Sequence, residues 1–123
     1  MKKDALNWFE IAVADMPRAK KFYETILGTT LQECAMEGAQ MAMFPADWEK
    51  GVGGCLTLME GMGPGPGGTM VYLNVEGELD AVIARIEPAG GKVCRPRFAI
   101  GQHGFIAIFS DSEGNVVGLH SLS

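Results

Sequence analysis

Hydrophobic positions recur with two different periods near the start of the chain. In residues 8–13, WFEIAV, every second side chain is apolar, which predicts a β-strand. The apolar residues that follow at helical spacing are Ala19, Phe22, Tyr23 and Ile26. Asp15 is a suitable N-cap for this helix, Pro17 fits its first turn, and Gly28 is a typical residue at a helix end. The pattern therefore predicts a strand followed by a helix.

The same order recurs 62 residues later. Residues 70–75, MVYLNV, alternate again, and an apolar helical stripe follows at Leu79, Val82, Ile83 and Ile86. A shift of 62 places Val13 on Val75 and Gly28 on Gly90. Each helix is followed by three expected strands, at residues 29–36, 38–44 and 54–59 and at residues 92–98, 105–110 and 115–121. We expect one domain over residues 1–123, made of two repeats at roughly 5–60 and 69–121 and joined by the Gly-rich linker 61–68.

The two faces of each first strand differ in character. One set of alternate side chains is uniformly apolar and is expected to pack on the helix that follows. The other set is mixed, with Trp8, Glu10 and Ala12 in the first repeat and Met70, Tyr72 and Asn74 in the second. A mixed set suits the lining of a concave sheet, where Glu10 would be partly desolvated. It equally suits a polar outer face with Glu10 in water, and the pattern leaves both interpretations open.

Two motifs together resemble the vicinal oxygen chelate superfamily, which includes glyoxalase I, extradiol dioxygenases and bleomycin-binding proteins. They are WFEIAVADMPRAKKFYETILG at residues 8–28 and DSEGNVVGLH at residues 111–120. The likeness is greatest to short glyoxalase-related proteins of bacteria and spans nearly the whole chain. It implies an α+β fold of two βαβββ modules whose cupped mixed sheet surrounds a cavity. It also implies a homodimer.

The resemblance also implies where a metal would bind. Metal-dependent members hold a divalent ion with His on the first strand of a module and Glu on the last strand. Those positions fall here on Trp8, Met70 and Gly118, and the fourth falls on Thr57 or Leu58. None of these side chains suits such an ion, so we expect no metal and no other cofactor. Gly118 is unusual inside a strand, and it leaves room for a ligand or a neighbouring ring.

Seven residues are candidates for the site that the resemblance implies. Glu10 and His120 are candidates for proton transfer, although Glu10 can equally serve the fold and His120 lies near the chain end. The candidates for ligand binding are Trp8, Met70, Tyr72, Asn74 and Gly118. Sequence alone does not say which of His103, Arg95, Arg97, Cys55 and Phe105 face the same cavity.

Composition narrows the classes of partner. The net charge is −5 and no cluster of Lys and Arg exceeds two residues, so nucleic acid is not expected. No apolar run approaches the roughly 20 residues that span a bilayer, so a membrane is not expected either. The three cysteines match no zinc or redox spacing, which indicates free thiols and a cytoplasmic protein. The expected partner is a small organic molecule.

Three functions remain open at this point. The first is binding of a small organic molecule without a metal ion. The second is a metal-independent isomerase, epimerase or lyase that uses Glu10 as acid or base, with or without His120. The third is a metal-dependent enzyme similar to lactoylglutathione lyase, with displaced ligands that include Glu10 and His120.

Overall fold

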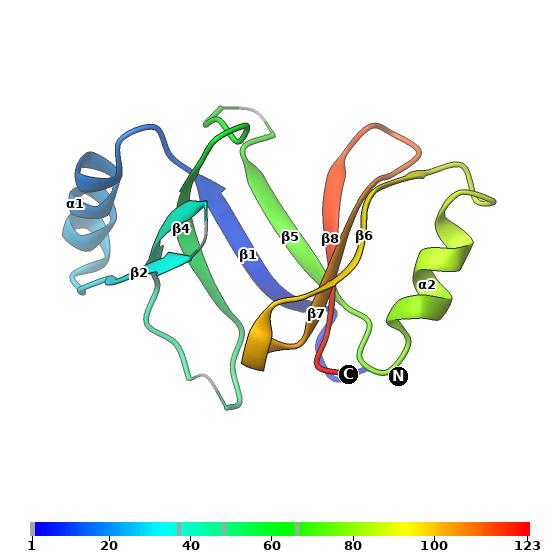
Figure 1. Cartoon of the computed structure of the whole chain (residues 1–123). Coiled ribbons are helices and arrows are strands. Elements are labelled where there is room, and N and C mark those ends of the chain that lie inside the picture. The colour runs from blue at the N-terminus through cyan, green and yellow to red at the C-terminus, as the bar shows by residue number, and fades with distance from the viewer. Residues whose placement is uncertain (1, 37, 48, 66) are drawn as a thin grey trace. The chain divides into compact units, whose positions relative to one another are not determined.

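The computed structural model describes residues 2–36, 38–47, 49–65 and 67–123, in which the element order βαβββ occurs twice (Figure 1). The chain divides into two compact units. The N-terminal unit is Trp8–Thr69, and the C-terminal unit is Met70–Ser123 together with the segment that ends at Asn7. Among the described residues, no helix is both long enough and apolar enough to cross a membrane.

As far as its residues are described, the N-terminal unit is a four-stranded mixed sheet with one helix. Its elements are β1 (Leu6–Ala12, which begins in the C-terminal unit), α1 (Met16–Leu27), β2 (Gln32–Met36), β3 (Ala39–Met43) and β4 (Gly53–Met59). The strand order is β2-β3-β4-β1, with β1 and β4 parallel and the other pairs antiparallel.

The C-terminal unit repeats this arrangement. Its elements are β5 (Thr69–Asn74), α2 (Leu79–Ile86), β6 (Lys92–Ala99), the 3-10 turn η1 (Gly101–His103), β7 (Phe105–Ser110) and β8 (Val116–Ser121). The strand order is β5-β8-β7-β6, again with one parallel pair, β5 with β8.

The ends of α1 follow from the residues that the sequence places there. The Asp15 Oδ1 atom accepts the backbone N–H of Arg18 at 3.0 Å, which satisfies a donor that the helix itself cannot. Gly28 takes the left-handed conformation, with φ 64°, and its N–H reaches the Glu24 carbonyl at 2.9 Å. The left-handed backbone ends the helix, and glycine suits this position because a side chain would be strained in that conformation.

Each helix packs on one face of its own sheet. The alternation predicts this face, but in the second repeat only Val75 of the predicted apolar set joins the core, while Leu73 is 37% exposed. Ile11 and Val13 pack with Met16, Ala42 and Leu56 under α1. The corresponding core under α2 contains Leu79, Ile86, Ala107, Leu119 and Val75. Full burial of one such leucine contributes about 1.5–3 kcal/mol. In the described part of the chain, the α-helix of each unit covers only one face of its sheet, and we call the opposite face the helix-free face of that unit.

The apolar stripe on α1 is only partly buried. Ala19 and Tyr23 pack in the core, whereas Phe22 is 56% exposed and Ile26 is 59% exposed. Phe22 precedes Tyr23 by one residue, which is about 100° around the helix axis. The packed side of α1 is therefore the line through Met16, Ala19 and Tyr23, and the other two residues lie beside it.

The predicted linker, residues 61–68, contains one residue, Pro66, that lies outside the described part of the chain. Gly68 N–H bonds the Gly65 carbonyl at 2.8 Å, and the Gly68 carbonyl accepts the Ala12 N–H at 2.8 Å. The role of this stretch as a linker between repeats stays a prediction.

Candidate functional site

The helix-free face of the C-terminal unit is built from the alternate residues of its four strands. Tyr72 pairs with Gly118, and Asn74 pairs with His120, so these four predicted residues share this face. The strand pairings add Ile106, Ile108 and Ser110 from β7 and Lys92, Arg95 and Phe98 from β6. Met70 lies two residues before Tyr72 and is therefore on the same face.

Tyr72 explains why residue 118 is a glycine. A Cβ atom at Gly118 would lie 2.3 Å from Tyr72 Cδ2 and 2.5 Å from Cε2, far inside van der Waals contact. The tyrosine ring therefore lies directly against the Gly118 backbone, where Tyr72 is only 5% exposed. The sequence indicates that Gly118 leaves room either for a ligand or for a neighbouring ring, and in the structure the Tyr72 ring takes that room.

His120 is held from both sides within the C-terminal unit. Its Nε2 atom lies 2.7 Å from the His103 carbonyl oxygen, and its Nδ1 atom lies 3.0 Å from Asn7 Nδ2. Because a carbonyl oxygen only accepts, Nε2 carries the proton and Nδ1 accepts from the Asn7 amide. Both ring nitrogens are therefore used inside the fold. His103 lies in η1 and contributes its backbone to this contact.

Asn74 is also used inside the fold. Its Nδ2 atom donates to the Asp4 carbonyl at 3.0 Å, and its Oδ1 atom accepts the Glu76 N–H at 3.1 Å. Glu76 in turn accepts the Leu122 N–H at 2.7 Å, which lowers the pKa of its carboxyl group. These contacts join residues from both ends of the chain beside the end of β5.

Glu10 belongs to a second group of polar residues, on the helix-free face of the N-terminal unit. Thr57 Oγ1 donates to Glu10 Oε1 over 3.4 Å, and Cys55 Sγ lies 3.2 Å from the same hydroxyl. Since Thr57 has one hydroxyl proton, the Cys55 thiol donates to Thr57 while Thr57 donates to Glu10. Trp8 and Glu10 lie two residues apart on β1 and share this face. The result is a short chain of hydrogen bonds that ends at a half-buried carboxylate.

Cys55 is a poor nucleophile in this position. Burial raises the pKa of its thiol to about 12, and the nearby Glu10 carboxylate acts in the same direction. Cys34 and Cys94 are exposed.

Glu10 and His120 belong to different units, so their predicted partnership stays a prediction.

The sequence profile of the Glyoxalase/Bleomycin resistance protein/Dioxygenase superfamily matches residues 5–119. The chain belongs to this superfamily. The family resemblance and the α+β, glyoxalase-like fold are thereby confirmed. This glyoxalase superfamily assignment covers both βαβββ modules.

Curated and solved relatives agree with this membership. A protein named "Putative glyoxylase CFP32", from Mycobacterium tuberculosis and Mycobacterium bovis, is 30% identical over 118 residues, which are 92% of this chain and 44% of that protein. The chain thus spans less than half the length of these curated relatives.

The fold is similar to that of methylmalonyl-CoA epimerase from M. tuberculosis, with TM-score 0.67, 19% identity and coverage of 97% of this chain and 88% of the other. A Streptomyces coelicolor methylmalonyl-CoA epimerase variant in complex with 2-nitronate-propionyl-CoA gives TM-score 0.66 at 18% identity, with coverage of 95% and 96%.

The residues at the superfamily's metal positions do not suit a hard divalent ion. Trp8, Met70 and Gly118 supply no imidazole or carboxylate. The fourth position is Cys55, because Cys55 pairs with Glu10 on β1 as Gly118 pairs with Tyr72 on β5. The expectation of Thr57 or Leu58 there was wrong, since sequence alone does not fix the register of β4. Within the described ranges, no group of three His, Cys, Asp or Glu is placed to hold a metal ion.

The two arginines that flank Pro96 lie on different faces. Arg95 pairs with Ile108 on the helix-free face, and its guanidinium lies 3.5 Å from the centre of the Phe98 ring. Arg97 lies 4.0 Å from the Phe105 ring centre and 3.3 Å from Asp80 of α2, on the helix side. This separation could not be predicted from the sequence. Residues two apart on a regular strand share a face, so Arg95 and Arg97 would be expected on the same side.

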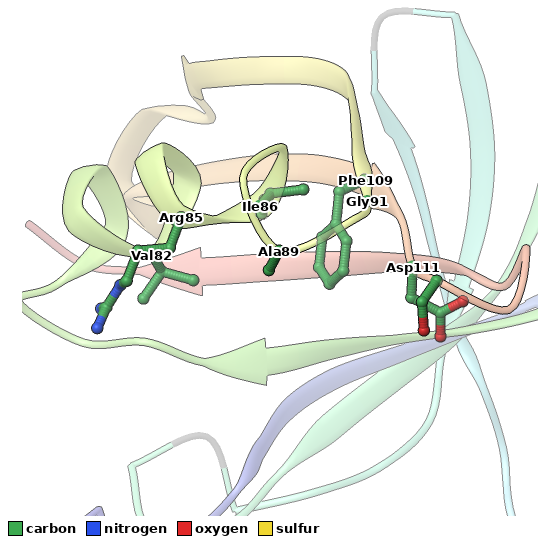
Figure 2. A pocket seen from close by; sticks show the side chains of 8 residues that line it. Val82, Arg85, Ile86, Ala89, Gly91, Phe109 and Asp111 are labelled. Carbon is green, nitrogen blue, oxygen red and sulfur yellow. The ribbon is translucent and has the colours of Figure 1, made fainter.

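A shallow groove of about 320 Å³ lies on the helix side of the C-terminal unit. Figure 2 shows its lining at the end of α2, with Arg85 and Asp111 at opposite ends. Val82, Ile86, Ala89 and Phe109 make it largely apolar. None of the predicted ligand-binding residues lines it.

Proposed function

We propose that this protein binds a small organic molecule on the helix-free face of its C-terminal unit and does so without the usual divalent metal site. The observation that carries the proposal is the Tyr72 ring packed on Gly118. In metal-dependent superfamily members this strand position supplies a carboxylate ligand. Here it carries no side chain and packs against the buried Tyr72 ring, which lies under a partly exposed apolar face, and apolar surfaces suit organic ligands.

The surroundings of Tyr72 support the same use. Ile106 and Ile108 lie on this face and are each partly exposed, as is Phe98. Tyr72 forms a buried floor, while these three side chains offer accessible apolar surface. Asn74 and His120 are engaged within the fold, and we assign them the role of supporting the face.

The test is an NMR titration of the ¹⁵N-labelled chain with two probes, 1-naphthoate and 1-naphthamide. We expect saturable shifts at Gly118, Ile106 and Ile108 with at least one probe, and weaker binding in Tyr72→Leu. Phe109→Leu is the matched control, because it removes a ring from the opposite face of the same unit. Shifts confined to the groove of Figure 2, or no saturable shifts with either probe, would overturn the proposal.

The absence of the superfamily's usual divalent ion is tested separately, by elemental analysis of protein purified without a tag or chelator. We expect far less than one Ni, Zn, Mn, Co or Fe per chain. A stoichiometric amount of any of them would overturn this part of the proposal and favour a metal enzyme with displaced ligands.

A second candidate function is metal-independent proton transfer by Glu10. The observation that favours it is the hydrogen-bond chain from Cys55 through Thr57 to the Glu10 carboxylate, which orients one oxygen. The fold likeness to methylmalonyl-CoA epimerases suggests methylmalonyl-CoA as the first substrate to try. Deuterium uptake from D₂O at its α-carbon would measure the step. Glu10→Gln should abolish uptake and retain binding, whereas equal uptake in that variant would exclude Glu10 as the base.

The homodimer that the resemblance implies and the cytoplasmic location stay predictions. Light scattering coupled to size-exclusion chromatography measures the first, with twice the 13.2 kDa chain mass as the expected result.

A further inference from the structure

Arg95 is the residue that distinguishes the helix-free face of the C-terminal unit from a plain apolar surface. We propose that the ligand of this face is an organic carboxylate, whose charged group binds Arg95 while its apolar part lies on Phe98 and Ile108. This inference rests on the proposed function and specifies the class of ligand.

Two irregularities in β6 bring Arg95 to this face. The pairing with β7 shifts between Val93 and Arg95 and again between Arg95 and Phe98. Without them, Arg95 and Arg97 would share a face. With them, Arg95 and Phe98 share one face and Arg97 lies on the other. Such bulges characteristically re-aim a side chain next to a site.

The two arginines also differ in their charge partners. Arg97 forms an ion pair with Asp80 at 3.3 Å. Among the ion pairs found in the described ranges, none includes Arg95 or Lys92. The Arg95 guanidinium instead stacks on the Phe98 ring, 3.5 Å from its centre. A stacked guanidinium keeps its N–H edge available for the two oxygens of a carboxylate.

The charges around Arg95 point to the same class of ligand. The chain has a net charge of −5, yet none of the residues that the described strand pairs place on this face is Asp or Glu. Lys92 adds a second cation at its edge. An acidic chain thus presents a locally basic, partly apolar surface, and a local excess of positive charge favours an anion.

The experiment compares the two naphthalene probes, which have the same ring and differ in charge. We expect 1-naphthoate to bind the full chain about tenfold more tightly than 1-naphthamide, since a charge-assisted hydrogen-bond pair contributes more than a neutral one. Arg95→Gln should reduce this preference to near unity. Arg97→Gln removes the same charge from the other face and should keep the preference. Both arginines are exposed, and thermal unfolding of each variant checks that the fold is retained.

The outcomes separate this inference from the proposed function. If both probes bind this face with equal affinity, and Arg95→Gln leaves the affinities unchanged, the ligand is not a carboxylate. The proposal that organic molecules bind this face would still stand. If the preference for 1-naphthoate falls equally in Arg95→Gln and Arg97→Gln, the proposal would also be overturned, because the preference would then depend on net charge. If neither probe binds this face, the proposed function itself would be overturned.

Discussion

Substitution of Gly118 by alanine is the most direct test of the Tyr72 contact. The new Cβ atom would lie 2.3 Å from Tyr72 Cδ2, about 1.1 Å inside the 3.4 Å at which ordinary contact begins. Tyr72 is 5% exposed, so its ring has little room to move away. Overpacking of this kind costs about 1–3 kcal/mol. Replacing a strand glycine by alanine returns about 0.5–1 kcal/mol.

We therefore expect Gly118→Ala to lower the free energy of unfolding by about 1 kcal/mol, since the difference of these two effects spans about 0–2.5 kcal/mol. Urea unfolding followed by circular dichroism measures it. In a Tyr72→Ala background the clash is gone, and the same substitution should be neutral or stabilising by up to about 1 kcal/mol. Gly63→Ala is the control, since a Cβ there meets no atom within 4 Å.

The double-mutant comparison decides the point. If Gly118→Ala costs the same with and without the Tyr72 ring, the ring is not the reason for the glycine. The packing explanation for residue 118 would then be refuted, together with the Tyr72–Gly118 contact from which the proposed function is argued.

Three further predictions concern stability and reactivity. Cys34 and Cys94 should react with Ellman's reagent in the native protein, whereas Cys55, whose pKa burial raises to about 12, should react only in urea. Asp15→Ala should cost about 1 kcal/mol in urea unfolding, and Asp15→Ser, another good N-cap, should recover most of it. Glu76 has a lowered pKa, so its contribution is present above the ordinary carboxyl pKa and is lost as pH falls through the folded value. The stability difference between Glu76→Gln and the parent should therefore vanish in acid, and a constant difference across the titration would contradict this.

The order of elements was predictable because it depends on local signals. Alternation over residues 8–13 and 70–75 specified two strands, and capping residues such as Asp15 and Gly28 specified where α1 begins and ends. The faces followed in part, since Ile11 and Val13 pack under α1 as a period-2 strand requires, whereas only Val75 of the second apolar set packs under α2. These features need only neighbours in sequence, and they also carry the family resemblance.

The contacts of the candidate residues were less predictable because they depend on the register between strands. Cys55 and Thr57 meet Glu10 only because β1 and β4 pair in parallel with Glu10 opposite Cys55. Arg95 and Arg97 separate only because β6 is irregular against β7. A bulge changes which face a side chain occupies without leaving a hydrophobic pattern in the strand. The neighbours of a residue across strands were therefore outside the reach of the sequence.

The contact between Tyr72 and Gly118 also gives the protein a built-in spectroscopic probe. One α-proton of Gly118 occupies the direction that a Cβ would take, and it points at the tyrosine ring. The ring current of Tyr72 should displace the resonance of this proton from that of an ordinary strand glycine. Any molecule that tilts or replaces the ring would shift it again. A single proton signal at the middle of β8 can thus report on events at this face without any added label.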